Sequence, residues 1–156
     1  MSATVHLIVN GRAEVLQAEP TDTLLEALRR DLWLKSVREA CGIGVCGSCT
    51  VLVDGRPISS CLLLARLAEG TTVETVESLT DGETLHPIQQ AFVDHTAFQC
   101  SYCTPGFVLA TKALLEENPR PSADEVRHYL AGNLCRCGSY RNIEEAVLDA
   151  ADRLGG

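Results

Sequence analysis

The eight cysteines of this 156-residue chain fall into two groups of four. In the first group, four residues separate Cys41 from Cys46, two separate Cys46 from Cys49, and Cys61 follows. This is a spacing with which four thiolates hold a [2Fe–2S] cluster. The first group therefore predicts that the chain carries electrons.

Three glycines lie between the cysteines of the first group, at Gly42, Gly44 and Gly47. A short loop that wraps an anionic cluster must point backbone N–H groups at the sulfurs, and glycine accepts the dihedral angles that this requires. Such N–H donation also sets the reduction potential of a cluster. We therefore predict that the three glycines contact the cofactor and tune it.

The second group has a spacing that no ferredoxin uses: Cys100, Cys103, Cys135 and Cys137. Four thiolates here could bind a second [2Fe–2S] cluster, which would make the chain a relay, and structural zinc remains an alternative for this group. A disulfide framework is disfavoured, because no secretory signal is recognisable and the chain is long enough to bury a core.

Composition restricts the partners. The chain is 46% hydrophobic with a net charge of −8, and its basic residues are scattered, which argues against a nucleic-acid-binding surface. The apolar run over residues 61–65 is too short to span a bilayer. We expect a protein without a membrane span, assembled in the reducing cytoplasm.

The first half of the chain predicts a small sheet with one helix. Apolar residues alternate over 5–9, Asn10-Gly11 is a hairpin turn signal, and residues 14–18 return. The run Thr21-Asp22-Thr23 predicts the capped start of a helix over residues 24–28. A second hairpin follows, with strands over 50–53 and 58–61 and a turn at 54–57. A last strand over 72–76 completes this half.

The second half has helical periodicity. We predict a helix over 85–92, one starting at Pro105 with Thr104 as its cap and ending near residue 118, and one after the Ser122–Glu125 capping box. A last helix is predicted with Asn142 as its cap. These helices put the second group of cysteines at helix ends, and the polar segment 78–84 reads as a linker.

The motifs together resemble one family. A CGxGxCGxC loop is followed by Gln99-Cys100-x-x-Cys103-Thr104-Pro105-Gly106 and by Gly132-Asn133-Leu134-Cys135-Arg136-Cys137. Two such motifs in this order resemble the small [2Fe–2S] iron–sulfur subunit of the molybdenum hydroxylases, which include xanthine dehydrogenase, aldehyde oxidoreductases and isoquinoline 1-oxidoreductase.

The resemblance implies an α+β fold: a β-grasp, plant-type ferredoxin-like domain over 1–77, the linker 78–84, and a four-helix-bundle [2Fe–2S] domain over 85–156. It implies an electron-transfer subunit of an oxidoreductase without catalytic residues of its own. Electrons would pass from a molybdopterin cofactor in a large partner subunit through both clusters to a medium FAD-binding subunit or a cytochrome. Gln99 and Cys137 are expected to contact the pterin, and oxidation of an aldehyde or an N-heterocycle is the expected reaction.

Several alternatives stay open on the sequence. Gln99 could be an ordinary helix-end amide, and Asn133 and Arg136 could serve backbone carbonyls and surface charge rather than the cluster. Many family members read Cys-Arg-Cys-Thr-Gly-Tyr, whereas this chain continues from Cys137 with Gly138-Ser139-Tyr140. A free-standing ferredoxin-type carrier is the alternative function.

Overall fold

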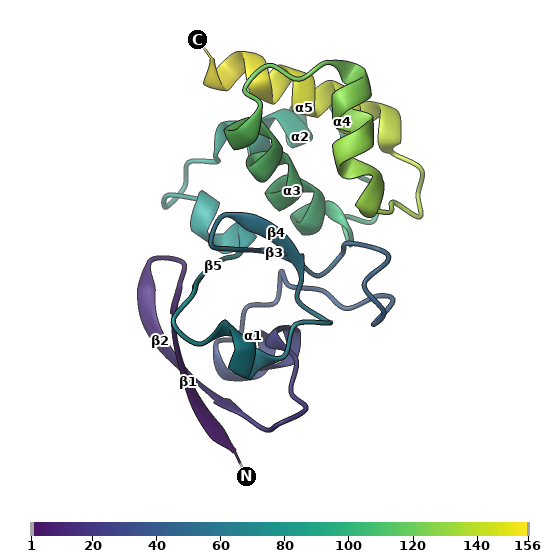
Figure 1. The fold of residues 1–156 in the computed structure, drawn as a ribbon. Coiled ribbons are helices and arrows are strands. Elements are labelled where there is room, and N and C mark those ends of the chain that lie inside the picture. The colour runs from purple at the N-terminus through teal and green to yellow at the C-terminus, as the bar shows by residue number, and fades with distance from the viewer. Residues whose placement is uncertain (1, 156) are drawn as a thin grey trace.

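The computed structural model describes residues 2–155 and consists of a sheet-containing N-terminal half and a helical C-terminal half, stacked one on the other (Figure 1). The sheet has five strands in the order β2-β1-β5-β3-β4. β1 is parallel to β5, and the other neighbouring pairs are antiparallel. The strands are β1 (Ala3–Val9), β2 (Arg12–Ala18), β3 (Thr50–Val53), β4 (Arg56–Ser59) and β5 (Thr72–Glu74).

Both hairpins turn on two residues with positive φ, which is the geometry that Asn-Gly and Asp-Gly pairs favour. Asn10 and Gly11 have φ values of 51° and 77°, and Asp54 and Gly55 have 48° and 78°. The predicted first hairpin is confirmed. The second turn ends at Gly55, so β4 starts and ends earlier than the predicted strand over 58–61.

The helix α1 (Leu24–Asp31) packs its apolar face on the sheet. Thr23 caps it as predicted: its Oγ1 accepts from the Glu26 amide at 3.2 Å, and the Glu26 carboxylate accepts from the Thr23 amide at 2.8 Å. A single 3₁₀ turn, η1 (Ala65–Ala68), closes the same core. Val37, before the first cysteine, and Cys61, the last of the first group, both belong to this core, so it anchors both ends of the segment that carries the group.

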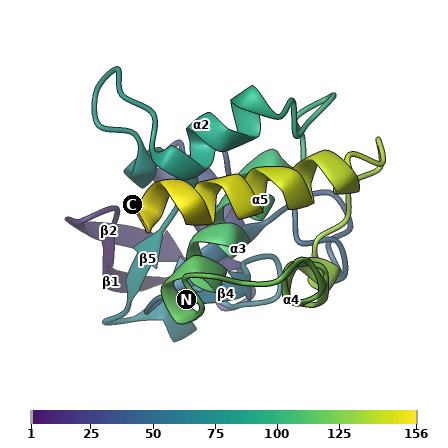
Figure 2. The ribbon, with the colours of Figure 1, turned by 90° about the horizontal axis from the view of Figure 1, so that it is seen from above.

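Four α-helices form the second half, α2 (Pro87–Asp94), α3 (Thr104–Glu117), α4 (Ala123–Tyr129) and α5 (Tyr140–Leu154). Seen from above, α5 crosses over α3, with α2 on one side and α4 on the other (Figure 2). Their shared core includes Phe92, Phe107, Val126, Ile143 and Val147. The 3₁₀ turns η2 (Val76–Leu79) and η3 (Leu130–Gly132) lie at the entry to this half and after α4. The predicted capping box at the start of α4 is confirmed.

Two predicted helix caps are wrong. Thr104 is the first residue of α3 rather than its cap, and its buried Oγ1 has no hydrogen-bond partner. Asn142 lies in the first turn of α5 and donates to the His95 carbonyl at 2.9 Å. The helix starts earlier because the Ser139 amide is held by the sulfur of Cys135 at 3.4 Å, so α5 begins directly after the cysteine loop.

The two halves meet along a small apolar contact between β3 and α3. Leu52, Leu109 and Ala113 form a buried cluster of their own there, and Leu52 and Leu109 are 0% and 1% exposed. The observed fold is α+β, as predicted. The contact brings the two groups of cysteines toward each other.

Candidate metal centres

The first group of cysteines lies on the loop between α1 and β3 and at the end of the β3–β4 hairpin. Cys46, Cys49 and Cys61 are buried, and Cys41 is half-buried. Their thiols interact in pairs, Cys41 with Cys46 and Cys49 with Cys61. The structure thus brings the predicted four thiols into one site.

Glycine is required at two positions of this loop. Gly44 and Gly47 have φ values of 75° and 69°. A Cβ at Gly44 would lie 2.3 Å from Cδ1 of Leu62, and one at Gly47 would lie 2.4 Å from Nδ2 of Asn133. Gly42, with φ of 64°, has more room. The loop therefore keeps its backbone folded inward, as a cradle for an inorganic cluster must.

The second group lies where helices begin. Cys103 is the residue before α3, and Cys135 and Cys137 lie on the loop before α5. Cys100 is exposed, Cys103 and Cys137 are half-buried, and Cys135 is buried. The thiols again interact in pairs, Cys100 with Cys137 and Cys103 with Cys135. This site is more open to its surroundings than the first.

In each group, the surroundings lower the pKa of some thiols and raise the pKa of others. The amide of Ile43 and the neighbouring Cys46 thiol lower the pKa of Cys41 to about 6, whereas burial and the Cys49 thiol raise the pKa of Cys61 to about 11. Burial and the Cys135 thiol likewise raise the pKa of Cys103 to about 12. Binding of iron requires all the thiolates, so it releases the protons that these groups hold.

Backbone amides point at sulfur in both groups. The Ile43 amide donates to Cys41 Sγ at 3.5 Å. In the second group, burial raises the pKa of Cys135, but hydrogen bonds led by that from the Ser139 amide outweigh it, so the pKa is lowered. The Tyr102 amide, and after it the Cys137 thiol, lower the pKa of Cys100. N–H donors to thiolate sulfur are what an anionic cluster needs.

A buried polar contact joins the two sites. Asn133 is 7% exposed, and its Nδ2 donates to the Gly47 carbonyl at 3.1 Å. Next to it, the Leu134 amide donates to the Cys46 carbonyl at 2.8 Å. A residue beside Cys135 is therefore hydrogen-bonded to Cys46 of the other site. Sequence reasoning noted Asn133 but missed its partner, because nothing in a local motif indicates a contact with a distant loop.

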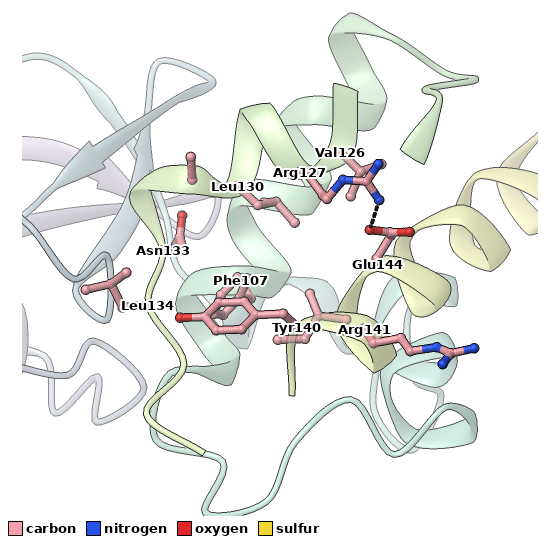
Figure 3. A pocket seen from close by; sticks show the side chains of 11 residues that line it. Phe107, Val126, Arg127, Leu130, Asn133, Leu134, Tyr140, Arg141 and Glu144 are labelled. Carbon is pink, nitrogen blue, oxygen red and sulfur yellow. Dashed lines mark hydrogen bonds and ion pairs between the residues drawn. The ribbon is translucent and has the colours of Figure 1, made fainter. Parts of the chain in front are cut away.

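An apolar groove opens beside the second site, between α4 and α5 and over Phe107 of α3 (Figure 3). It has a volume of about 680 Å³, and the Arg127–Glu144 ion pair, 2.7 Å long, closes part of its rim. Leu134 and Tyr140 line both the groove and a smaller hollow that includes Cys100, Cys103 and Cys135. The Tyr140 hydroxyl also accepts from the Cys135 amide at 2.9 Å. The groove thus lies next to the hollow of the second site, with Leu134 and Tyr140 between the two.

The donor set fits two [2Fe–2S] clusters. Four thiolates hold a cluster of this kind, and each group supplies four cysteines. Backbone N–H groups next to the sulfurs of both groups suit the anionic charge of such a cluster.

Comparison with known proteins agrees with two [2Fe–2S] sites. Residues 7–85 match the family described as 2Fe-2S iron-sulfur cluster binding domain, and residues 75–148 match the [2Fe-2S] binding domain family. The nicotine 6-hydroxylase small subunit of Paenarthrobacter nicotinovorans is 47% identical over 94% of this chain and 88% of its own length. The nicotinate dehydrogenase small FeS subunit of Eubacterium barkeri is 43% identical over 96% of each.

The chain belongs to the iron–sulfur subunits of the molybdenum hydroxylases. Among solved structures, quinoline 2-oxidoreductase from Pseudomonas putida 86 matches this subunit with a TM-score of 0.95 and 44% identity, over 99% of this chain and 98% of that one. The aldehyde oxidoreductase from Desulfovibrio desulfuricans ATCC 27774 matches with a TM-score of 0.94 and 44% identity, over 98% of this chain but 17% of the much longer one.

As a member of this family, the subunit holds two [2Fe–2S] clusters and transfers electrons for a molybdenum-dependent oxidoreductase, without carrying out the oxidation itself. It works with a large catalytic partner, so the free-standing ferredoxin is set aside. No helix within residues 2–155 is long and apolar enough to cross a membrane.

Proposed function

We propose that Cys41, Cys46, Cys49 and Cys61 ligate one cluster and Cys100, Cys103, Cys135 and Cys137 the other, and that electrons pass from the second cluster to the first. The observation that carries this proposal is the contact between the sites: the Leu134 amide donates to the Cys46 carbonyl at 2.8 Å, so a hydrogen bond links the two ligand segments. When bound, the clusters supply one-electron redox chemistry. Residues 1–77 and 85–156 would be the two cluster domains, and 78–84 their linker.

The second site is proposed to face the molybdopterin cofactor of the large subunit. Gln99 and Cys100 are exposed, and no hydrogen bond within residues 2–155 occupies the Gln99 side chain. An amide in that position is available to hydrogen-bond a cofactor outside the chain, and the half-buried sulfur of Cys137 would lie against the same cofactor. Exposed apolar side chains next to it, Leu134 and Tyr140 at 48% each, support burial by that partner.

The first site is proposed to pass electrons to an acceptor, which is a medium FAD-binding subunit or a cytochrome. The rim of its loop is apolar and open: Ile43, Val45 and Leu62 are 66%, 56% and 60% exposed. Exposed apolar residues around a redox centre favour a protein partner that covers them. Because electron transfer needs a short path, this rim is the natural docking point for the acceptor.

The reaction of the complex is proposed to be the oxidation of an N-heterocycle or an aldehyde, which agrees with the names of the nicotine, nicotinate, quinoline and aldehyde enzymes among the relatives. We further propose assembly in the cytoplasm, since all eight cysteines are free thiols and cluster assembly needs reduced thiols.

The test compares two variants in the intact complex. Gln99→Ala should keep the iron content and slow electron transfer from molybdenum to the clusters, because it removes one hydrogen bond worth about 0.5–1.5 kcal/mol and no ligand. Cys137→Ser should lose the second cluster, together with turnover to any external acceptor. Iron analysis and EPR distinguish the two. If Gln99→Ala lost the cluster as Cys137→Ser does, Gln99 would support the loop and would not be a cofactor contact.

A further inference from the structure

A cationic side chain from the N-terminal half reaches into the loop of the second site. Arg38 is half-buried and lies just before the first group of cysteines. Its guanidinium donates to the backbone carbonyl of Ser101, between Cys100 and Cys103. It also stacks over the ring of Tyr102, with 5.4 Å between the guanidinium carbon and the ring centroid.

The peptide that Arg38 holds also carries the N–H that acts most strongly on the Cys100 thiol. In a trans peptide the carbonyl and the N–H point in opposite directions. The carbonyl of the Ser101–Tyr102 peptide accepts from Arg38, so its N–H, which belongs to Tyr102, points away from Arg38, and this amide is the first of the groups that lower the pKa of the Cys100 thiol. Fixing one end of the peptide therefore fixes the other.

The conformation of this peptide is not one that the loop would adopt by default. Ser101 has a φ of 62°, in the left-handed region that residues with a Cβ rarely adopt. A rotation of the Ser101–Tyr102 peptide would leave this φ unchanged but would turn the carbonyl toward the sulfur. The hydrogen bond from Arg38 opposes that rotation, and the Tyr102 hydroxyl, which donates to the Glu39 carbonyl, holds the loop against the same segment.

We propose that Arg38 is a positioning residue for the second cluster: it holds the Ser101–Tyr102 peptide so that the Tyr102 N–H donates to the Cys100 sulfur. Reduction adds negative charge to a cluster, and an N–H donor to a ligand sulfur stabilises that charge. Arg38 therefore raises the reduction potential of the second cluster. The N-terminal half in this way tunes the cluster of the other half, and the inference rests on the proposed ligand role of Cys100.

The experiment is an EPR-monitored redox titration of both clusters in the intact complex, for the native chain, Arg38→Met, Arg38→Lys and Tyr102→Phe. Arg38→Met should lower the reduced-to-oxidised ratio of the second cluster about tenfold at a fixed potential, which for one electron is about 59 mV. The first cluster should not shift. Arg38→Lys keeps the charge and one donor and should shift the second cluster less. Tyr102→Phe keeps the amide and the Arg38 hydrogen bond and loses only the hydroxyl bond to the Glu39 carbonyl, so it should also shift the second cluster less than Arg38→Met.

Arg12→Met is the matched control, because it removes the same charge from strand β2 of the same half. An equal shift of both clusters in Arg38→Met, or the same shift in Arg12→Met, would show a general charge effect and overturn the proposal. No shift in Arg38→Met would overturn it as well.

A second readout does not depend on the potential. After exchange into D₂O, the deuteron coupling at the second cluster, measured by ENDOR, should weaken in Arg38→Met and persist in Tyr102→Phe. Should Arg38→Met fail to assemble with its partner, Arg38→Lys takes its place in both measurements, and an unchanged potential and coupling there refute the proposal. A native complex with iron for only one cluster per chain would instead refute the ligand assignment, so the two failures are distinguishable.

Discussion

Replacing Gly47 by alanine tests whether the two cluster-binding segments form one rigid unit. Gly47 has a φ of 69°, and a Cβ there would lie 2.4 Å from Nδ2 of Asn133 and 2.7 Å from the Gly132 carbonyl oxygen. The left-handed conformation costs alanine about 1–2 kcal/mol, and overpacking of a close contact costs about 1–3 kcal/mol. We expect Gly47→Ala to destabilise the chain by about 2–5 kcal/mol.

Two other glycines separate these causes. Gly70 has a φ of 73°, and a Cβ there would have no other atom within 4 Å, so Gly70→Ala carries only the conformational cost of about 1–2 kcal/mol. Gly106 lacks the positive φ, but a Cβ there would lie 2.2 Å from the Gly47 carbonyl oxygen, so Gly106→Ala carries only the packing cost of about 1–3 kcal/mol. The two variants therefore measure separately the two costs that Gly47→Ala combines.

The assay is thermal unfolding of the iron-loaded complex together with iron analysis and EPR of both clusters. The extra cost of Gly47→Ala over Gly70→Ala, about 1–3 kcal/mol, corresponds to a melting temperature lower by about 2–12 °C. We also expect a weaker magnetic interaction between the clusters, since the methyl group pushes the segments apart. If Gly47→Ala and Gly70→Ala had equal melting temperatures and equal EPR spectra, the contact between Gly47 and Asn133 would accept a methyl group without cost. The two segments would then not form a rigid unit.

Three further outcomes are expected. Asn133→Ala removes one donor to the Gly47 carbonyl, which keeps its hydrogen bonds from the Thr50 amide and hydroxyl, so it should lower stability by only about 0.5–1.5 kcal/mol with iron retained, as urea unfolding and iron analysis would show; loss of iron would mean that Asn133 supports a cluster directly. Leu134→Glu puts a charge into the groove beside the second site and should weaken association with the large subunit, measured by analytical ultracentrifugation, whereas Leu67→Glu, at a residue 66% exposed elsewhere, should not. The hydrogen bond from Arg153 lowers the pKa of Asp149, so its stabilisation is present above the unfolded pKa of about 3.9 and is lost as the pH falls below that value, through the lower folded pKa. The difference in melting temperature between the native chain and Arg153→Gln should therefore hold from about pH 7 to about pH 5 and shrink as the pH falls below about 4, and a difference that stayed constant below about pH 4 would contradict it.

Local features of the fold follow from the sequence because local interactions cause them. The Asn10-Gly11 turn, the Thr23 cap and the Ser122 capping box each involve residues within a few positions of one another, and all three were predicted correctly. The spacing of the first group of cysteines indicates its cluster for the same reason: one short loop supplies most of the site.

The starts of two helices show where local reasoning fails. The sequence offered Thr104 and Asn142 as caps, but α3 and α5 begin earlier, at Thr104 itself and at Tyr140. In the second case the sulfur of Cys135 takes the Ser139 amide, and Asn142 reaches the far carbonyl of His95 instead. The cysteine loop before the helix, and not the capping preference of a side chain, therefore sets where α5 begins.

By itself, the sequence predicted two clusters and the kind of complex that the chain serves, through two cysteine motifs in a fixed order, while zinc in the second group and a free-standing carrier stayed open as alternatives. Only the tertiary structure decided how the two cysteine loops are joined. Asn133 meets Gly47 across 86 positions, and Arg38 meets Ser101 across 63. Such contacts arise because β3 packs against α3 and brings the two loops together, and no pattern within either loop specifies the face that the other half will cover.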